Sequence, residues 1–247
     1  MSNAANLLLL SNSTMFGRAY LEHARDAVAD LFAGVRRVHF APYALAEHAG
    51  YTARVQAALG PLGISVVGLH GVSDPRREIE DAEALFVGGG NTFRLLRRLW
   101  QLGLIEPVRR RGMTGELRYL GASAGSNVAC PTIRTTNDMP IVQPESFEAF
   151  GLIPFQINPH YQDPLVESTH MGETREDRIL QFLQENQVPV LGMREGGWLR
   201  LSAAALRLEG LTAARLFERG QPPREIQPGS ELSWLLESPA RFDSPGG

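Results

Sequence analysis

YLGASAGS, residues 119–126, is the stretch of the chain that decides the fold. An apolar run enters a G-x-S-x-G pattern, which predicts a strand, a sharp turn and the start of a helix. Small residues on both sides of Ser123 allow the tight turn, and the hydroxyl then stands at a helix N-terminus, where backbone N–H groups stabilise negative charge. A second interpretation stays open, because short motifs recur by chance: glycine and alanine fill a crowded turn, and Ser123 only caps the helix.

Strands and helices alternate on the N-terminal side of this stretch. Short apolar runs predict strands at residues 5–10, 35–42, 64–69 and 84–87. Helical spacing of apolar residues predicts helices at 16–32, 51–59, 74–82 and 92–100, with an extension of the last helix to 111 as an alternative. Strand–helix–strand units of this length form right-handed crossovers. We therefore expect an α/β fold with a mostly parallel sheet covered by helices on both faces.

The C-terminal half of the chain is less regular. We expect residues 129–142 to loop over the Ser123 turn, and we expect strands at 155–160 and 188–193. A helix should run from about 172 to 184, with Thr174 and Asp177 forming a capping arrangement. Residues 199–208 and 211–218 resemble a β-hairpin or edge strands, and the tail is expected to be irregular from about residue 221.

Length and composition fit one ordinary globular domain spanning residues 1–247. The formal net charge of −3 gives no indication of nucleic acid or an anionic membrane as a partner. The four leucines at 7–10 are too few for a signal-peptide core or a membrane span. A single cysteine, Cys130, excludes an intrachain disulfide and fits the cytoplasm, where we expect the protein to reside.

Small or polar residues follow four of the predicted strands. They are the run Gly88-Gly89-Gly90-Asn91, and the single residues Ser123, His160 and Glu195. The carboxyl ends of parallel strands line one crevice, so these groups should converge there. A serine nucleophile needs a base, and an imidazole base needs an acceptor that fixes its tautomer, so the four sites together favour nucleophilic catalysis.

Each of these sites also has a structural interpretation when it is taken alone. His160 follows a proline and could simply end a strand, and Glu195 precedes two glycines and could be a solvated turn residue. The three glycines at 88–90 could bind a phosphate, but they match neither the P-loop nor the spaced-glycine dinucleotide pattern.

Five segments together resemble the peptidase E, or α-aspartyl dipeptidase, family. They are VGGGNTF (87–93), GASAG (121–125), CPTIRTTNDMPIV (130–142), INPH (157–160) and GETRE (172–176). The resemblance covers roughly residues 5–220 in the same order, and the thirteen-residue block is far more specific than G-x-S-x-G. It implies a class I glutamine-amidotransferase-like (flavodoxin-like) three-layer sandwich with a C-terminal β extension. It also implies a cytoplasmic serine peptidase that cleaves dipeptides, and some short peptides, beginning with aspartate.

The resemblance places the nucleophile on Ser123, the base on His160 and the third triad member on Glu195. This order, Ser-His-Glu, differs from the Ser-Asp/Glu-His order of α/β-hydrolases and argues against an ordinary esterase. The amide of Ala124 and that of Gly89 or Gly90 would form the oxyanion hole.

A substrate that begins with aspartate needs a cation for its side chain and an acceptor for its ammonium. We expect Arg175 to bind the carboxylate in a bidentate way; in the alternative it is an exposed helix residue paired with Glu176 or Asp177. Asp138 or Glu173 would face the ammonium, and Asp138 is also the second candidate for orienting His160. Further expected pocket residues are Asn91, Thr132, Thr135 and Asn137.

No metal and no cofactor are expected, since the histidines show no H-E-x-x-H or comparable ligand spacing. We expect small peptides as the partners of a monomer or homodimer. Two alternatives stay open: a β-aspartyl or cyanophycin-type peptidase on the same scaffold, and a non-catalytic module that binds a small acid. An intact set of Ser123, His160 and Glu195 argues against the module, because a binder does not need all three.

Overall fold

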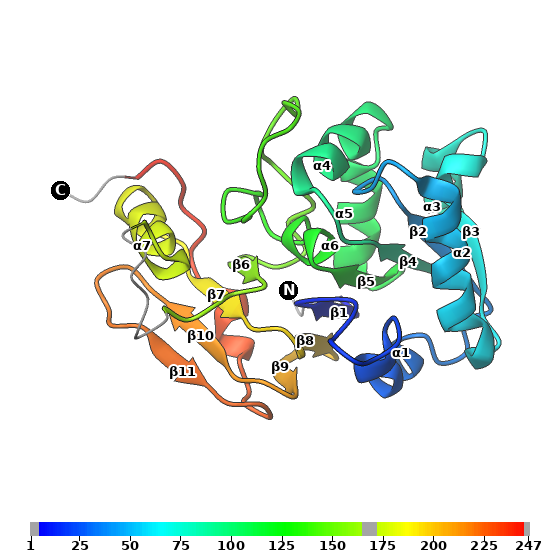
Figure 1. The fold of residues 1–247 in the computed structure, drawn as a ribbon. Coiled ribbons are helices and arrows are strands. Elements are labelled where there is room, and N and C mark those ends of the chain that lie inside the picture. The colour runs from blue at the N-terminus through cyan, green and yellow to red at the C-terminus, as the bar shows by residue number, and fades with distance from the viewer. Residues whose placement is uncertain (1–4, 165–171, 245–247) are drawn as a thin grey trace.

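A computed structural model describes residues 5–164 and 172–244 of the chain. A mostly parallel sheet runs through its centre (Figure 1). Five parallel strands come first, in the order β3 (Ser65–Gly68), β2 (Arg37–Ala41), β4 (Ala84–Val87), β5 (Arg118–Ala122) and β1 (Leu7–Leu10). The antiparallel strands β8 (Gly197–Ser202) and β9 (Ala205–Gly210) complete the sheet beyond β1.

Helices cover both faces of this sheet, so every residue of β1 is buried. Leu7 and Leu9 pack with α4 (Thr92–Gln101) and α5 (Ile105–Thr114) on one face. Leu8 and Leu10 pack with α1 (Arg25–Leu31) and α2 (His48–Leu59) on the other face. This alternation explains why a continuous leucine run forms a strand. The fold is therefore the expected three-layer α/β sandwich.

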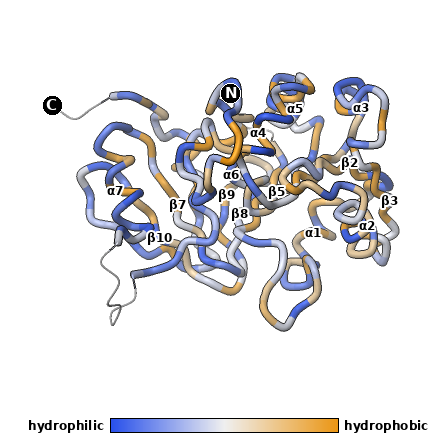
Figure 2. Tube along the Cα trace, turned by 45° about the horizontal axis from the view of Figure 1, so that its top comes forward, coloured by the Kyte–Doolittle hydropathy of each residue, from blue (hydrophilic) through white to orange (hydrophobic). Residues whose placement is uncertain are grey.

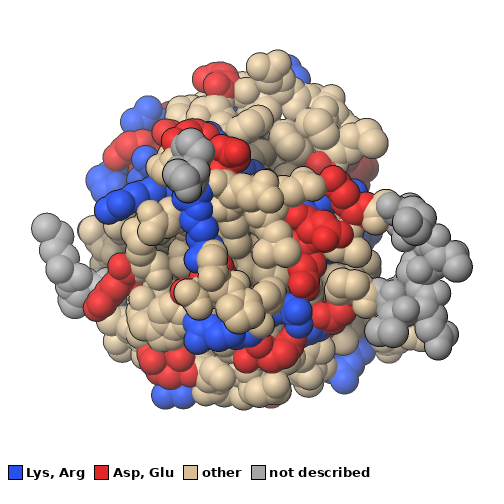
Figure 3. All heavy atoms as spheres, turned by 90° about the vertical axis from the view of Figure 1, so that its left-hand side faces the viewer, with Lys and Arg blue, Asp and Glu red and all other residues tan. Residues whose placement is uncertain are grey.

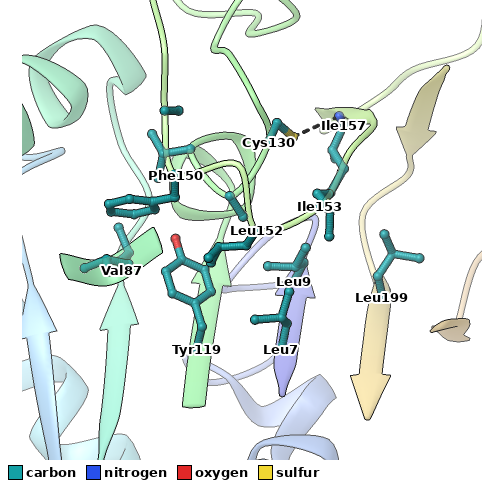
Figure 4. Close-up of a cluster of buried hydrophobic side chains, with 14 of the residues drawn as sticks. Leu7, Leu9, Val87, Tyr119, Cys130, Phe150, Leu152, Ile153, Ile157 and Leu199 are labelled. Carbon is teal, nitrogen blue, oxygen red and sulfur yellow. Dashed lines mark hydrogen bonds between the residues drawn. The ribbon is translucent and has the colours of Figure 1, made fainter. Parts of the chain in front are cut away.

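The core is visible in two views. Hydrophobic residues follow the central strands, and hydrophilic residues lie on the outer helices (Figure 2). The close-up shows Leu7 and Leu9 beside Tyr119 of β5 and Leu199 of β8 (Figure 4). The Cys130 thiol is buried there and accepts a hydrogen bond from Ile157 N at 3.2 Å. Burial raises the pKa of this thiol to about 12, so it stays protonated at neutral pH.

A second sheet forms where a single sheet was expected. Its order is β11 (Arg224–Ile226), β10 (Ala214–Phe217), β7 (Val190–Met193) and β6 (Gln156–Pro159), with only β6 and β7 parallel. The helix α7 (Arg175–Glu185) packs on it through Ile179 and Leu183. Side chains on strands β6, β7 and β10 join the core cluster of the first sheet, so the two sheets share one core.

Two helix predictions are corrected. In place of one helix at 16–32, the chain forms turns, a 3₁₀ turn η1 (Glu22–Ala24) and the short α1. Gly17 and Leu21 have positive φ angles of 74° and 60°, which interrupt a right-handed helix. The alternative extension to residue 111 does not form either, because Gly103 with φ 63° separates α4 from α5.

The remaining elements are short. The helix α3 (Pro75–Asp81) begins after Asp74, whose side chain caps it, and 3₁₀ turns lie at η2 (Gly60–Leu62) and η3 (Leu69–Gly71). Strands β8 and β9 form a hairpin, whereas β10, expected beside them, pairs with β7 in the second sheet. The tail contains β11 and η4 (Ser233–Glu237), and its end at 245–247 lies outside the described residues. No described helix has the length and apolar character to cross a bilayer.

Arg194 fastens the second sheet to the loop that follows β6. Its guanidinium donates to both carboxylate oxygens of Asp163, each at 2.6 Å, and to those of Glu225 at 3.0 and 2.8 Å. These hydrogen bonds hold the pKa of both carboxyls below their usual values. Figure 3 shows acidic and basic side chains interleaved on the side of the molecule that carries the second sheet.

This arrangement predicts an acid-sensitive contribution to stability. A carboxyl whose pKa is lower in the folded than in the unfolded chain adds stability that is complete above its unfolded pKa, about 4 for Asp and Glu. That stability is lost as the pH falls through the lower, folded-state pKa. The difference in unfolding free energy between wild type and Arg194→Met should therefore be largest above about pH 5 and narrow below about pH 4. Urea unfolding across this range measures it.

The matched control is Arg178→Met, because Arg178 is exposed and lies 3.8 Å from its nearest carboxylate, Glu173. The unfolding free energy of this variant should differ little from that of wild type, and the difference should not depend on pH. If the difference in unfolding free energy between wild type and Arg194→Met stayed constant down to about pH 3, Asp163 and Glu225 would not be the source of the acid-sensitive stability.

Candidate active site

The Ser123 turn depends on close backbone packing. Ser123 lies between β5 and α6 (Ala124–Asn127) with φ 53° and ψ −110°, a conformation that side-chain-bearing residues rarely adopt. A Cβ added to Gly125 would lie 2.0 Å from Val87 O, and one added to Gly121 would lie 2.6 Å from Gly125 O. Only glycine fits at either position, so the pattern around Ser123 is required by the geometry of the turn.

Three side chains form a hydrogen-bonded chain at this turn. Ser123 Oγ lies 3.0 Å from His160 Nε2, and His160 Nδ1 lies 2.7 Å from Glu195 Oε1. Because a carboxylate can only accept, Nδ1 carries the proton, and Nε2 is left to accept from the Ser123 hydroxyl. This is the arrangement that activates a serine nucleophile.

The residues after β1 hold the other two loops in place. Ser11 Oγ donates to Met193 O at 2.8 Å and accepts from His160 N at 3.0 Å. Asn12 Oδ1 accepts from Gly196 N at 2.8 Å, which fixes the turn after Glu195. Neither residue was predicted from the sequence, although a polar pair directly after a buried strand in the same sheet was a usable signal.

A cavity of about 300 Å³ opens in front of Ser123. It brings together the predicted residues Ser123, Ala124, Asn137, Asp138, His160, Arg175 and Glu195. It also includes residues that were not predicted, namely Thr92, Asn127, Thr136, Pro159 and Gln162. Within the described parts of the chain, no group of three or more His, Cys, Asp or Glu side chains is arranged to hold a metal ion.

Arg175 is the first residue of α7 and is half-buried at the cavity. It forms no hydrogen bond or ion pair with any residue of 5–164 or 172–244. Burial lowers the pKa of its guanidinium, Arg178 adds to this, and the Asp138 carboxylate opposes it. Neither alternative partner is available, because Glu176 pairs with Arg215 at 3.0 Å and Asp177 completes the capping box with Thr174.

Asp138 does not orient His160. Its Oδ2 accepts from Thr92 N at 2.7 Å and from Thr92 Oγ1 at 2.6 Å, so it binds the first turn of α4. It still lines the cavity, whereas Glu173, the other candidate for an ammonium, accepts from Gln181 and lies outside it. The carboxylate on His160 is that of Glu195.

Three predicted pocket residues have structural contacts instead of lining this cavity. Thr132 and Thr135 are buried, and both hydroxyls accept from Gln156 Nε2, at 3.1 and 3.2 Å. Asn91 caps α4 by accepting from Arg94 N at 3.0 Å, and it donates to Met139 O at 2.9 Å. A polar residue in a long loop often satisfies backbone groups, and the sequence does not separate this use from ligand binding.

The candidate oxyanion-hole amides differ in their surroundings. A Cβ on Gly89 would lie 3.1 Å from Ser123 Cβ, so the glycine run packs directly against the serine. Burial raises the pKa of the Tyr51 hydroxyl, and the Gly89 backbone nearby opposes this rise. The amides of Gly90 and Ala124 have no hydrogen-bond acceptor among the described residues.

Comparison with known proteins finds relatives that match most of the chain. The pattern of the family described as Peptidase family S51 matches residues 7–208. A relative named peptidase E from Streptomyces coelicolor is 56% identical, over 97% of this chain and 98% of its own. A relative from Drosophila melanogaster named probable alpha-aspartyl dipeptidase is 48% identical, over 96% of this chain and 100% of its own.

Two solved structures share the fold. One is of a putative peptidase E protein from Listeria monocytogenes, with a TM-score of 0.63 and 21% identity over 84% of this chain and 99% of that one. The other is of a peptidase from an acI-B1 actinobacterium, with a TM-score of 0.68 and 15% identity over 94% of this chain and 98% of that one.

The geometry predicts which carboxylate activates Ser123. Glu195→Gln should slow the reaction of Ser123 with a small uncharged fluorophosphonate by roughly 10⁴-fold, because an amide can donate to Nδ1 and impose the wrong tautomer. Asp138→Asn should change this rate by less than about tenfold, since Asp138 bonds Thr92 and not His160. Both labelling rates are measured by mass spectrometry of protein samples quenched at successive times. A larger loss in the folded Asp138→Asn protein would reverse the assignment.

Proposed function

The chain belongs to peptidase family S51, and from this we propose that it is a serine exopeptidase that cleaves dipeptides, and some short peptides, after an N-terminal aspartate. One observation carries the proposal. A half-buried arginine with no partner among the described residues, Arg175, lines the same cavity as the hydrogen-bonded chain Ser123–His160–Glu195. The names of the relatives, peptidase E and probable alpha-aspartyl dipeptidase, support the same substrate class.

In the proposed first step, Ser123 Oγ attacks the peptide carbonyl carbon while His160 Nε2 takes the hydroxyl proton. Glu195 stabilises the resulting imidazolium through its hydrogen bond to Nδ1. The negative charge on the carbonyl oxygen is stabilised by the Ala124 N–H and by the Gly90 N–H, neither of which has an acceptor in the described parts of the chain. Each such donor lowers the barrier by about 3 kcal/mol.

In the second step, the tetrahedral intermediate collapses and the C–N bond breaks. His160 gives its proton to the leaving amine, which departs as a free amino acid or a shortened peptide. A water molecule then attacks the aspartyl ester on Ser123, with His160 again accepting a proton, and free aspartate is released.

Charge in the cavity fits a substrate that begins with aspartate. Arg175 offers a planar pair of N–H donors to the side-chain carboxylate, which can accept them in a bidentate way. Asp138 supplies a negative charge for the α-ammonium. Two other arginines of the loops around Ser123 and Glu195 are already paired with carboxylates: Arg194 binds Asp163 and Glu225, and Arg134 binds Asp243 at 2.6 Å.

Two alternatives remain as outcomes of a test. A β-aspartyl or cyanophycin-type peptidase would present the same charges, but with the scissile bond on the side-chain carboxyl. A non-catalytic module would bind the acid without turnover. A cytoplasmic monomer or homodimer, without metal or cofactor, remains the expected form of the protein.

The reaction class is tested with a panel of dipeptides. Wild type should release free amino acids from Asp-Leu, and Ser123→Ala should lose nearly all of this turnover while keeping its fold, because it lacks the hydroxyl that His160 activates to form the ester. Glu-Leu, Asn-Leu and β-Asp-Leu complete the panel. Preferred cleavage of β-Asp-Leu would support the first alternative, and binding of Asp-Leu without turnover would support the second.

Specificity is tested at Arg175. Aspartate and asparagine have nearly the same shape, and leaving the arginine unpaired costs roughly 3 kcal/mol. Wild type should therefore prefer Asp-Leu over Asn-Leu by at least about 100-fold in kcat/KM, and Arg175→Ala should remove most of that preference.

Arg178→Ala is the matched control, since Arg178 lies one turn along the same helix, is exposed and is absent from the cavity lining. It should keep the wild-type ratio. An unchanged ratio in Arg175→Ala would show that another group recognises the carboxylate.

A further inference from the structure

Asn127 is a buried polar residue at the Ser123 cavity. It is one of the residues that line the cavity, and it is only 1% exposed. Its Oδ1 has no hydrogen-bond partner among the described residues. Buried polar atoms nearly always have a partner, and an unpaired buried acceptor costs on the order of 1–3 kcal/mol. Such an atom near a reactive serine would therefore be stabilised by a ligand that donates a hydrogen bond to it.

The orientation of this amide is fixed by its other end. Asn127 Nδ2 donates to Ile157 O at 2.9 Å. A carbonyl oxygen can only accept, so the NH₂ group must face Ile157 and Oδ1 must be the free end. The side chain cannot rotate to offer a donor to the cavity without breaking this hydrogen bond.

The backbone fixes the position of Asn127 relative to the nucleophile. Asn127 N donates to Ser123 O at 2.9 Å, so Asn127 lies one helical turn beyond Ser123. Both residues line the same cavity, so the amide lies close to the reacting hydroxyl. The α-ammonium of a bound aspartyl dipeptide is separated from the scissile carbonyl by a single carbon.

We propose that Asn127 Oδ1 is an acceptor for the α-ammonium of the substrate and acts together with the Asp138 carboxylate. This rests on the proposed aspartyl dipeptidase function. An ammonium has three N–H donors and needs more than one acceptor when it leaves water. Asp138 Oδ2 already accepts two hydrogen bonds from Thr92, so a second, uncommitted acceptor completes the subsite.

This subsite makes the free N-terminus a requirement for cleavage. A peptide with a blocked or missing ammonium leaves Asn127 Oδ1 without a donor and the Asp138 carboxylate without a counter-charge in a partly desolvated cavity. The enzyme therefore selects the first residue of a peptide, and an internal aspartate is not a substrate.

The test compares Asp-Leu with N-succinyl-leucine, which has the same carboxylate and scissile amide but lacks the ammonium. Wild type should prefer Asp-Leu by at least about 100-fold in kcat/KM. In Asn127→Ala this ratio should fall by about tenfold or more, the usual effect of one hydrogen bond to a charged group. The loss should fall on Asp-Leu and leave N-succinyl-leucine nearly unchanged.

The variant is expected to fold, because Ile157 O keeps a hydrogen bond from Thr135 Oγ1 at 2.9 Å. Thermal unfolding and labelling of Ser123 by an uncharged fluorophosphonate check this. Asn158→Ala is the matched control: Asn158 Oδ1 is also buried and unpaired within the described chain, but Asn158 does not line the cavity. It should leave the substrate ratio at the wild-type value.

The outcomes separate this inference from the proposed function. A wild type that does not hydrolyse Asp-Leu rejects the function and the inference together. A wild type that hydrolyses both substrates equally well rejects the inference alone, as does an unchanged ratio in folded Asn127→Ala. If that variant does not fold, the inhibition constants of aspartate and succinate on wild type are compared instead, since succinate lacks only the ammonium. Equal inhibition constants would reject the inference.

Discussion

The Ser11 hydroxyl joins the two sheets at the point where the reaction is proposed to occur. It accepts from His160 N and donates to Met193 O, so one short side chain after β1 holds the ends of β6 and β7. Ser123 follows β5, the parallel neighbour of β1, and Ser123 N donates to Leu10 O at 3.0 Å. The distances within Ser123–His160–Glu195 therefore depend on this contact between sheets, which no single element of the chain provides.

The arginines around the second sheet differ in their pairing. Arg194, Arg215 and Arg134 each form an ion pair with a carboxylate, whereas Arg175 is left without a partner among the described residues. A single unpaired cation in a half-buried site favours an anionic ligand far more than a surface cation does, because screening by water is weaker there. Asn127 Oδ1, which has no partner among the described residues, favours a ligand group that donates a hydrogen bond. Arg175 and Asn127 together therefore match a small ligand that carries both a carboxylate and an ammonium.

Much of the first sheet could be predicted from sequence, because buried parallel strands leave short apolar runs. The strand at 84–87 and the Ser123 turn were predicted with their observed positions. The second sheet was not, since apolar periodicity reports burial and does not identify the neighbouring strand. The predicted helix at 16–32 was wrong. Its apolar residues have helical spacing, but the positive φ angles of Gly17 and Leu21 interrupt a right-handed helix. The serine, histidine, glutamate and arginine of the site could be predicted from the sequence. Ser11, Asn12 and Asn127 could not, because their roles depend on contacts between distant segments.

The central claim is that a serine held by one sheet is acylated with the help of a histidine and a glutamate held by the other. Acid quenching of wild type during turnover of Asp-Leu, followed by peptide mass spectrometry, tests it most directly. The account predicts an aspartyl ester on Ser123 within the peptide that contains residues 119–126, and its absence in Ser123→Ala. Turnover accompanied by an ester on any other residue, or sustained equally by folded Ser123→Ala, would contradict it.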